Sequence, residues 1–138
     1  MIQHEATKNT KDTKERGLVV SHEIIGAAIE VHRHLGPGLF ESAYEAALCQ
    51  ELWLRRLGFQ RQVPIKIVYK GQLLAAAVRL DLVVEQSVVV EIKAVAELAA
   101  IHRSQLLTYL KVSGFGVGLL INFNIRLLRS GIRRVLVG

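Results

Sequence analysis

Three charged side chains, Asp81, Glu91 and Lys93, interrupt a stretch that otherwise has the composition of a protein interior. Residues 79–93 read RLDLVVEQSVVVEIK, which predicts two apolar strands joined by a short polar turn, because β-branched valines favour strands. Buried charges are costly unless they are paired or bind a metal ion. The hairpin is therefore expected to contain either an internal salt bridge or a metal site.

The register of this hairpin decides whether the two carboxylates meet. Side chains alternate along a strand, so Glu91 and Lys93 share one face. A three-residue loop at 85–87 places Asp81 opposite Glu91 on that face, whereas a two-residue turn points Asp81 to the other side. Opposed carboxylates repel each other unless a cation, Lys93 or a metal ion, lies between them. Two hard oxygen ligands suit Mg²⁺, which leaves room for a phosphate, and the pattern favours phosphodiester hydrolysis as the chemistry.

The composition predicts one folded domain. A chain of 138 residues with 51% hydrophobic residues is long enough for one core. The single cysteine excludes an internal disulfide and predicts a reducing compartment, and no zinc site can be drawn from it and five scattered histidines. Because no segment has the length of a signal-peptide core or a membrane span, we expect a cytoplasmic protein that does not contact membranes.

The distribution of charge points to an anionic partner. The net charge is +6, and residues 94–138 carry six basic residues against Glu97 alone, a balance of +5. This asymmetry fits a nucleic acid, although a basic surface also serves solubility. The basic residues of this segment are Lys111, Arg103, Arg126, Arg129, Arg133 and Arg134.

Two helices are expected before the first strand. Polar residues 1–17 lack periodicity and are predicted to form a flexible tail, so the domain is expected to span residues 18–138. Ser21 is predicted to cap the first helix. The second helix, from about residue 39 to residue 57, carries Glu41 in its first turn. Glu41 is open to two interpretations, a favourable interaction with the helix N-terminus or a role in the site.

Strands and one more helix follow. Alternating apolar residues predict a strand at 62–69, which Pro64 places at a sheet edge or with its amide outward. Apolar runs at 116–121 and 132–137 predict a buried strand beside the hairpin and a last strand.

A helix is expected to begin near Ile101. In this helix, His102, Gln105 and Tyr109 recur at spacings of three and four residues. They form a polar stripe that could face the same cleft as Asp81 and Glu91. The alternatives are local hydrogen bonding for His102 and packing for Tyr109.

Motifs in order along the chain resemble one family. Asp81 followed by Glu91-Ile92-Lys93 resembles the bipartite signature of the PD-(D/E)XK nuclease superfamily, with Leu80 where that signature has proline. The run Gly38-x-x-Glu41-x-x-Tyr44 narrows the resemblance to the GxxExxY family of small PD-(D/E)XK-like proteins. The likeness extends from about residue 18 to residue 137, with a departure at Ala77-Val78. Its other segments are Arg61-Gln62-Val63-Pro64, Arg79-Leu80-Asp81, His102, Gln105-Leu106-Leu107-x-Tyr109-Leu110 and Leu120-Ile121-Asn122-Phe123.

The resemblance implies a fold of the α/β (α+β) class. Its restriction-endonuclease-like core has the order αβββαβ, with a mixed central sheet flanked by helices. In this chain an extra N-terminal helix and an extra C-terminal strand are expected around that core.

The resemblance also implies an enzyme, a Mg²⁺-dependent or Mn²⁺-dependent nuclease that hydrolyses DNA or RNA with a metal-activated water. In this interpretation Asp81, Glu91 and the Ile92 carbonyl hold the metal ion, and Glu41 reaches it directly or through water. Lys93 then orients the water and stabilises the transition state.

Nucleic acid, with DNA as the first expectation, is the implied partner. Two alternatives stay open, namely a catalytically inactive nucleic-acid-binding or assembly module and a homodimeric junction-resolving endonuclease, so a homo-oligomer is also open. The residues expected to contact nucleic acid are Arg79, His102, Gln105, Tyr109, Arg126, Arg129, Arg133 and Arg134.

Overall fold

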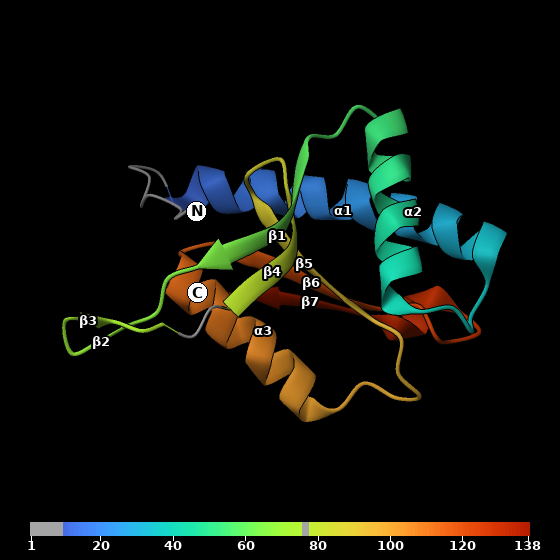
Figure 1. The fold of residues 1–138 in the computed structure, drawn as a ribbon. Coiled ribbons are helices and arrows are strands. Elements are labelled where there is room, and N and C mark those ends of the chain that lie inside the picture. Colours follow the sequence, from blue (N-terminus) through green and yellow to red (C-terminus); the bar gives the residue numbers. More distant parts are fainter. Residues whose placement is uncertain (1–9, 76–77) are drawn as a thin grey trace.

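The computed structural model describes residues 10–75 and 78–138. Its centre is a five-stranded sheet in the order β1-β4-β5-β6-β7, and the hairpin predicted from residues 79–93 supplies two inner strands, β4 and β5. Helices α1 and α2 cover one face of the sheet and α3 covers the other (Figure 1). The mixed sheet between helices confirms the predicted α+β class and the order of its core elements.

The elements have the following bounds. The helices are α1 (Thr10–Leu35), α2 (Glu41–Leu54) and α3 (Ala100–Ser113), and a 3₁₀ turn, η1 (Leu128–Gly131), precedes the last strand. The strands of the main sheet are β1 (Phe59–Ile65), β4 (Val78–Val84), β5 (Val88–Lys93), β6 (Val117–Asn122) and β7 (Ile132–Leu136). A separate two-stranded hairpin consists of β2 (Val68–Tyr69) and β3 (Gln72–Leu73).

The pairing of the inner strands follows the predicted register. Strands β4 and β5 are antiparallel with Val84 opposite Val88, as a three-residue loop requires. Helix α3 carries the chain across the sheet, so β6 is parallel to β5 and Lys93 pairs with Asn122. Strand β1, which contains Pro64, lies at one edge of the sheet and β7 at the other. These results confirm the added C-terminal strand and, of the two alternatives for Pro64, the position at a sheet edge. The predicted bounds of 62–69 are wrong, because β1 ends at Ile65 and residues 68–69 pair in the separate hairpin.

Each face of the sheet has its own apolar core. Along β5, Val88, Val90 and Ile92 pack against α1 and α2, whereas Val89 packs on the α3 side with Leu106. This alternation follows from the strand period of two. Glu91 lies between residues of the first set and therefore belongs to the α3 side of the sheet.

Helix α1 begins earlier than the sequence predicts. It already includes residues 10–17, and the Ser21 hydroxyl donates to the Leu18 carbonyl inside the helix, so the predicted cap at Ser21 is wrong. The physical reason is tertiary contact, which overrides the polar composition of this segment. A Cβ on Gly17 would lie 2.8 Å from a Val117 methyl carbon, and Arg16 pairs with Glu85 at 3.7 Å. Residues 1–9 of the predicted tail lie outside the described residues.

A glycine-containing turn separates the first two helices. Gly36 adopts a φ of +66°, a left-handed conformation that ends α1. Helix α2 is shorter than predicted at both ends. Within the described residues, no helix is long and apolar enough to cross a membrane.

Candidate active site

The regular pleat of β4 is interrupted at Asp81. Leu82 packs against α1 and α2, whereas Leu80 packs on the α3 side, although residues two apart on a regular strand share a face. The pairing of β1 with β4 skips Gln62 and Asp81, and Gln62 has a φ of +49°. Such irregularities re-aim side chains and often lie beside active sites. Here the irregularity takes Asp81 out of the ladder, so that its groups are available for other contacts.

Asp81 and Glu91 exchange hydrogen bonds with each other's strand. The Asp81 N–H donates to Glu91 Oε1 at 3.3 Å, and the Ile92 N–H donates to Asp81 Oδ2 at 2.8 Å. Regular pairing of β4 with β5 ends at Leu82 and Val90, so the carboxylates replace main-chain carbonyls as acceptors beyond that point. The structure thus brings the two predicted acids together, which confirms the register that placed Asp81 opposite Glu91.

The Glu91 carboxyl group is buried, and its pKa is strongly raised. Burial raises the pKa of Glu91 from 4.5 to about 9, and the charge of Asp81 and a hydrogen bond with its side chain act in the same direction. The charge of Lys93 opposes this rise. A pKa raised this far favours the protonated, neutral form of Glu91 at neutral pH. A divalent cation could replace that proton, because it would satisfy both carboxylates at once.

Lys93 lies partly buried at the end of β5, beside the pair. Its charge lowers the pKa of Glu91, but no ion pair joins its amine to either carboxylate within the part of the chain that the structure describes. The internal salt bridge considered from the sequence is thus not formed. Lys93 has an amine available for a ligand near the two acids.

Glu41 approaches the end of β5 from the other side of the sheet. It is exposed in the first turn of α2, and its Oε2 accepts the Ala94 N–H at 3.4 Å. Among residues 10–75 and 78–138, no group of three or more His, Cys, Asp or Glu side chains is arranged to hold a metal ion. The acid pair is thus separate from Glu41. The predicted carbonyl ligand Ile92 is fixed by the bond from its N–H to Asp81.

Comparison with known families agrees with this geometry. A family model described as the PD-(D/E)XK nuclease superfamily matches residues 19–135. The chain belongs to the PD-(D/E)XK nuclease superfamily. Proteins of this superfamily are generally nucleases, and the three helices around a mixed five-stranded sheet fit its restriction-endonuclease-like fold. Searches of curated proteins and of solved structures gave no match.

Glu45 is not part of the superfamily signature, and the sequence did not reveal its structural role. Only 8% exposed, it accepts two bonds from the Arg61 guanidinium at 3.1 and 2.9 Å and one from the Gln62 side chain at 3.0 Å. Its only sequence signal is its position one turn after Glu41. Arg79, one of the expected nucleic-acid contacts, is exposed and donates to the Gln62 carbonyl at 3.5 Å.

Tyr44 explains how this superfamily member positions Glu41. The Tyr44 ring is fully buried and stacks on Phe123 with 4.6 Å between centroids. Its hydroxyl donates to the Gly36 carbonyl at 2.6 Å and accepts the Leu39 N–H at 3.0 Å. These contacts tie the loop before α2 to the sheet and fix the first turn of α2 at the end of β5.

Removing the Tyr44 hydroxyl should therefore destabilise the fold. In Tyr44→Phe, the Gly36 carbonyl and the Leu39 N–H lose their common partner, which we expect to cost about 1–3 kcal/mol of unfolding free energy. Urea denaturation followed by circular dichroism measures the change. Tyr69→Phe is the control, because Tyr69 is exposed on the β2–β3 hairpin and should unfold like wild type. Equal midpoints for both variants would contradict this role of Tyr44.

The polar stripe of α3 has divided roles. His102 Nδ1 accepts the Ala99 N–H at 3.0 Å, which confirms local hydrogen bonding at the start of the helix. Burial and then the charges of Glu91 and Asp81 raise the pKa of Tyr109, so this side chain interacts electrostatically with the acid pair. Gln105 is exposed on the same helix. Tyr109 is therefore the member of the stripe with an electrostatic link to the two acids.

The C-terminal arginines do not form a single surface. Arg126 and Arg129 lie between β6 and β7, beside the end of α1. Arg133 and Arg134 are neighbours in β7 and so point to opposite faces of the sheet. The Arg133 guanidinium donates to the Ser130 carbonyl at 2.9 Å, which braces the end of η1. The expected nucleic-acid contacts are therefore divided among several parts of the surface.

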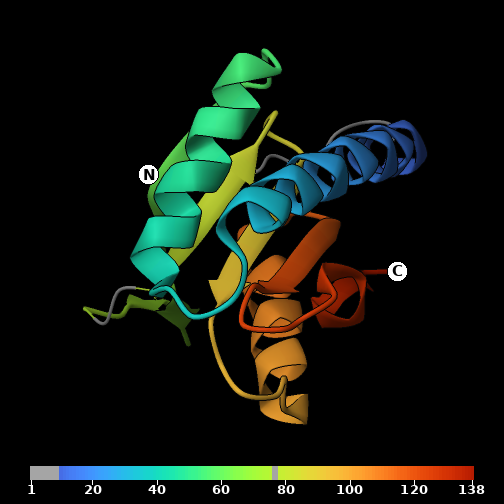
Figure 2. The same ribbon diagram turned by 90° about the vertical axis from the view of Figure 1, so that its right-hand side faces the viewer.

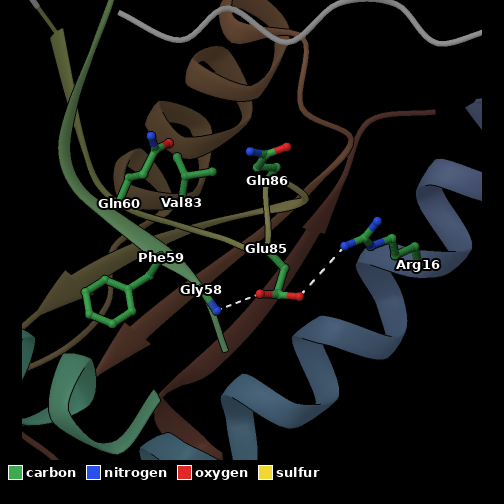
Figure 3. A pocket seen from close by; sticks show the side chains of 7 residues that line it. All are labelled: Arg16, Gly58, Phe59, Gln60, Val83, Glu85 and Gln86. Atoms are coloured by element: carbon green, nitrogen blue, oxygen red, sulfur yellow. Dashed lines mark hydrogen bonds and ion pairs between the residues drawn. The ribbon is translucent and has the colours of Figure 1, made fainter. Parts of the chain in front are cut away.

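A hollow of about 260 Å³ lies at the turn between β4 and β5, at the opposite end of the hairpin from Lys93 (Figure 3). Glu85 Oε2 accepts the Gly58 N–H at 2.6 Å, and Glu85 Oε1 faces Arg16 of α1 at 3.7 Å. These contacts join α1, the hairpin turn and the start of β1. We assign them a structural role, since the hollow does not include the acids of the superfamily signature. Its lining residues are Arg16, Gly58, Phe59, Gln60, Val83, Glu85 and Gln86.

Proposed function

We propose that this protein is a nuclease that hydrolyses phosphodiester bonds with Mg²⁺ or Mn²⁺ and a metal-activated water. The observation that carries the proposal is the Asp81–Glu91 pair, in which each acid accepts a hydrogen bond from the other's strand and Glu91 is buried. Among the described residues no ion pair joins Lys93 to either acid. Hard carboxylate oxygens are the ligands that these cations prefer. The donor set therefore fits a divalent cation in place of the proton.

In this proposal Asp81 and Glu91 hold the metal ion with the Ile92 carbonyl, and Glu41 contributes directly or through a water. When bound, the ion supplies a water of lowered pKa and neutralises charge on the scissile phosphate. The break in β4 holds Asp81 toward β5, and the bond from the Ile92 N–H fixes the Asp81 carboxylate in that position. The chain thus supplies a preformed pair of oxygen ligands.

Lys93 supplies the positive charge of the site. Its side chain leaves β5 on the same face as Glu91, because the two residues are two apart on a strand. We propose that the Lys93 amine hydrogen-bonds the attacking water and a non-bridging phosphate oxygen, where it stabilises the charge that develops in the transition state. The Tyr109 hydroxyl, near the same carboxylates, would orient a phosphate oxygen from α3.

The substrate we propose is nucleic acid, with DNA as the first candidate. A net charge of +6 supports an anionic polymer as the partner. The free Cys49 is consistent with a reducing compartment such as the cytoplasm. The motif at Gly38, Glu41 and Tyr44 supports membership of the GxxExxY family. Contacts to the polymer are proposed for Arg79, His102, Gln105, Tyr109, Arg126, Arg129, Arg133 and Arg134.

A cleavage assay over a panel of labelled DNA and RNA forms tests the proposal. Wild type should cut at least one form with Mg²⁺ or Mn²⁺ and none with EDTA. Lys93→Ala should cut more slowly by a factor of about 10² or greater, because one preorganised charge that stabilises the transition state is lost. Lys66→Ala, which removes an exposed lysine between β1 and β2, is the control and should keep the wild-type rate.

Two results of this panel would change the assignment. If wild type cuts no form with either metal, or if Lys93→Ala cuts as fast as wild type, the proposed mechanism is wrong. The first result would favour the catalytically inactive nucleic-acid-binding or assembly module, in which the protonated acid pair is only a buried hydrogen-bonded link. Paired nicks at equal rates on branched DNA would identify the homodimeric junction-resolving enzyme instead.

A further inference from the structure

A second hollow, of about 290 Å³, lies between the end of α1 and the segment that joins β6 to β7. Figure 2 looks at this end of the molecule, where the last turns of α1 lie above the red loop. Ile29, His32 and Arg33 line it from α1, on one helix face because their spacing is three to four residues. Residues 126–130 line it from the other side. We call this hollow the arginine pocket.

The arginine pocket is held in shape by specific contacts. His32 Nε2 donates to the Ile125 carbonyl at 2.7 Å, which ties α1 to the segment. Leu128 is buried and anchors η1 in the core. A Cβ on Gly131 would lie 2.5 Å from the Asn122 carbonyl oxygen, so the chain passes too close there for any other residue. The pocket is therefore a fixed feature of the fold.

The charges around the arginine pocket favour an anion. Arg126 and Arg129 are exposed, and their guanidinium groups form no hydrogen bond or ion pair with any other described residue. Arg33 has only Glu30 at 3.5 Å, a solvent-exposed pair that stabilises little. No carboxylate is among the lining residues. Guanidinium groups in this arrangement are suited to phosphate oxygens.

The remaining lining of the arginine pocket is apolar. Ile29, Leu127 and Leu128 form this part, and the Leu127 side chain is exposed. A bare phosphate has no group to place against such a wall. A nucleotide has one, because its base is flat and largely apolar on its faces and can also stack on a guanidinium plane.

The arginine pocket lies at the same end of the sheet as Lys93. Strands β5 and β6 are parallel, so both finish at this end, where Lys93 is paired with Asn122. The Phe123 N–H donates to the Lys93 carbonyl at 2.9 Å, and the chain continues from Phe123 through Ile125 to Arg126. Lys93 leaves β5 on the α3 side of the sheet and the arginine pocket lies on the α1 side, so a strand of nucleic acid that reaches both has to pass round the ends of β5 and β6.

We propose that the arginine pocket binds one unpaired nucleotide of the strand that is cut, with its phosphate against Arg126 and Arg129 and its base against the apolar wall. This inference rests on the proposed function and adds a class of substrate to it, namely nucleic acid with a single-stranded segment beside the cleaved bond. A continuous duplex keeps its bases stacked inside, so it can present phosphates to the arginines but cannot fill the apolar part.

Binding measurements in EDTA test this proposal without any need for cleavage. Fluorescence anisotropy is measured for a labelled single-stranded oligonucleotide and for its duplex, with wild type and with the double variant Arg126→Ala/Arg129→Ala. We expect the double variant to bind the single strand about 10-fold more weakly, with the slope of log K against log salt smaller by about 2. Duplex binding should weaken by a smaller factor.

The control removes the same charge elsewhere. Lys66→Ala/Lys111→Ala takes away two exposed lysines outside the arginine pocket and should change single-strand binding by about 2-fold at most. Equal losses in the two double variants, or equal losses of single-strand and duplex binding in the arginine variant, would overturn the proposal. If wild type cuts nothing but the arginine variant still loses single-strand binding, the proposed function fails and the nucleotide pocket stands.

Discussion

Asp81→Asn is expected to slow metal-dependent cleavage by on the order of 10³-fold or more, the scale seen when a group central to catalysis is removed. The reason is that one of the two carboxylates of the metal site becomes neutral. The amide oxygen can still accept the Ile92 N–H that now bonds Asp81 Oδ2, so the fold around the site should persist. Nucleic-acid binding in EDTA should be close to that of wild type.

Rates and binding are measured on the same preparations with the best substrate of the panel. Glu23→Gln is the matched control, since it removes an exposed carboxylate from α1 and should leave the rate unchanged. A rate for Asp81→Asn within about 10-fold of wild type would show that the acid pair does not hold the catalytic metal.

Glu91→Gln is expected to stabilise the metal-free protein, and to do so more strongly as the pH rises. The pKa of Glu91 is raised from 4.5 to about 9, so the folded state holds this proton more tightly than the unfolded state. Wild type therefore loses stability as the pH rises through this window, by at most about 1.4 kcal/mol per pH unit. Glutamine resembles the protonated acid and carries no charge, so this loss should be absent from the variant.

Urea midpoints at about pH 5, 7 and 9 in EDTA measure this difference. Near pH 5 the two proteins should unfold at similar urea concentrations, and the midpoint of the variant should be higher at the two other values. Glu91→Ala is the contrasting variant, because it leaves the Asp81 N–H without its acceptor and should be less stable than wild type throughout. Parallel pH profiles for wild type and Glu91→Gln would contradict the proton on Glu91.

Those elements whose patterns are local were predictable from the sequence. The valines around residues 85–87 fixed both strands of the hairpin and, through the loop length, the opposition of Asp81 and Glu91. Gly36 ends α1 and Lys70-Gly71 forms the turn between β2 and β3, because left-handed backbone conformations favour particular residues. Strands β6 and β7 were also predictable, because a strand that is buried on one face or on both carries a recognisable pattern of apolar residues.

Contacts between distant parts of the chain were not predictable in this way. The start of α1 depends on Gly17 meeting Val117, which a polar composition at residues 10–17 does not reveal. The ion pair of Glu45 with Arg61 joins α2 to β1, and nothing local in either segment specifies it.

The irregular pleat at Asp81 was also missed. Alternation predicts the face of each side chain only when a strand is regular, and here Leu80 and Leu82 lie on opposite faces. The register therefore predicted the correct pair of acids, but the irregularity that takes Asp81 out of the pairing with β1 was not predicted. Similarly, the arginines were identified by charge, while their division among separate surfaces depends on the position of η1 and the alternation of β7.

The central claim is that a divalent cation takes the place of the proton held by Asp81 and Glu91, and calorimetric titration of Mn²⁺ into the wild-type protein tests it most directly. Titrations near neutral pH in two buffers of different ionisation enthalpy give the number of protons released on binding. We predict binding with release of close to one proton, an affinity that rises with pH, and loss of this binding in Glu91→Gln. Absence of binding, or binding that releases no proton and persists in Glu91→Gln, would contradict the account.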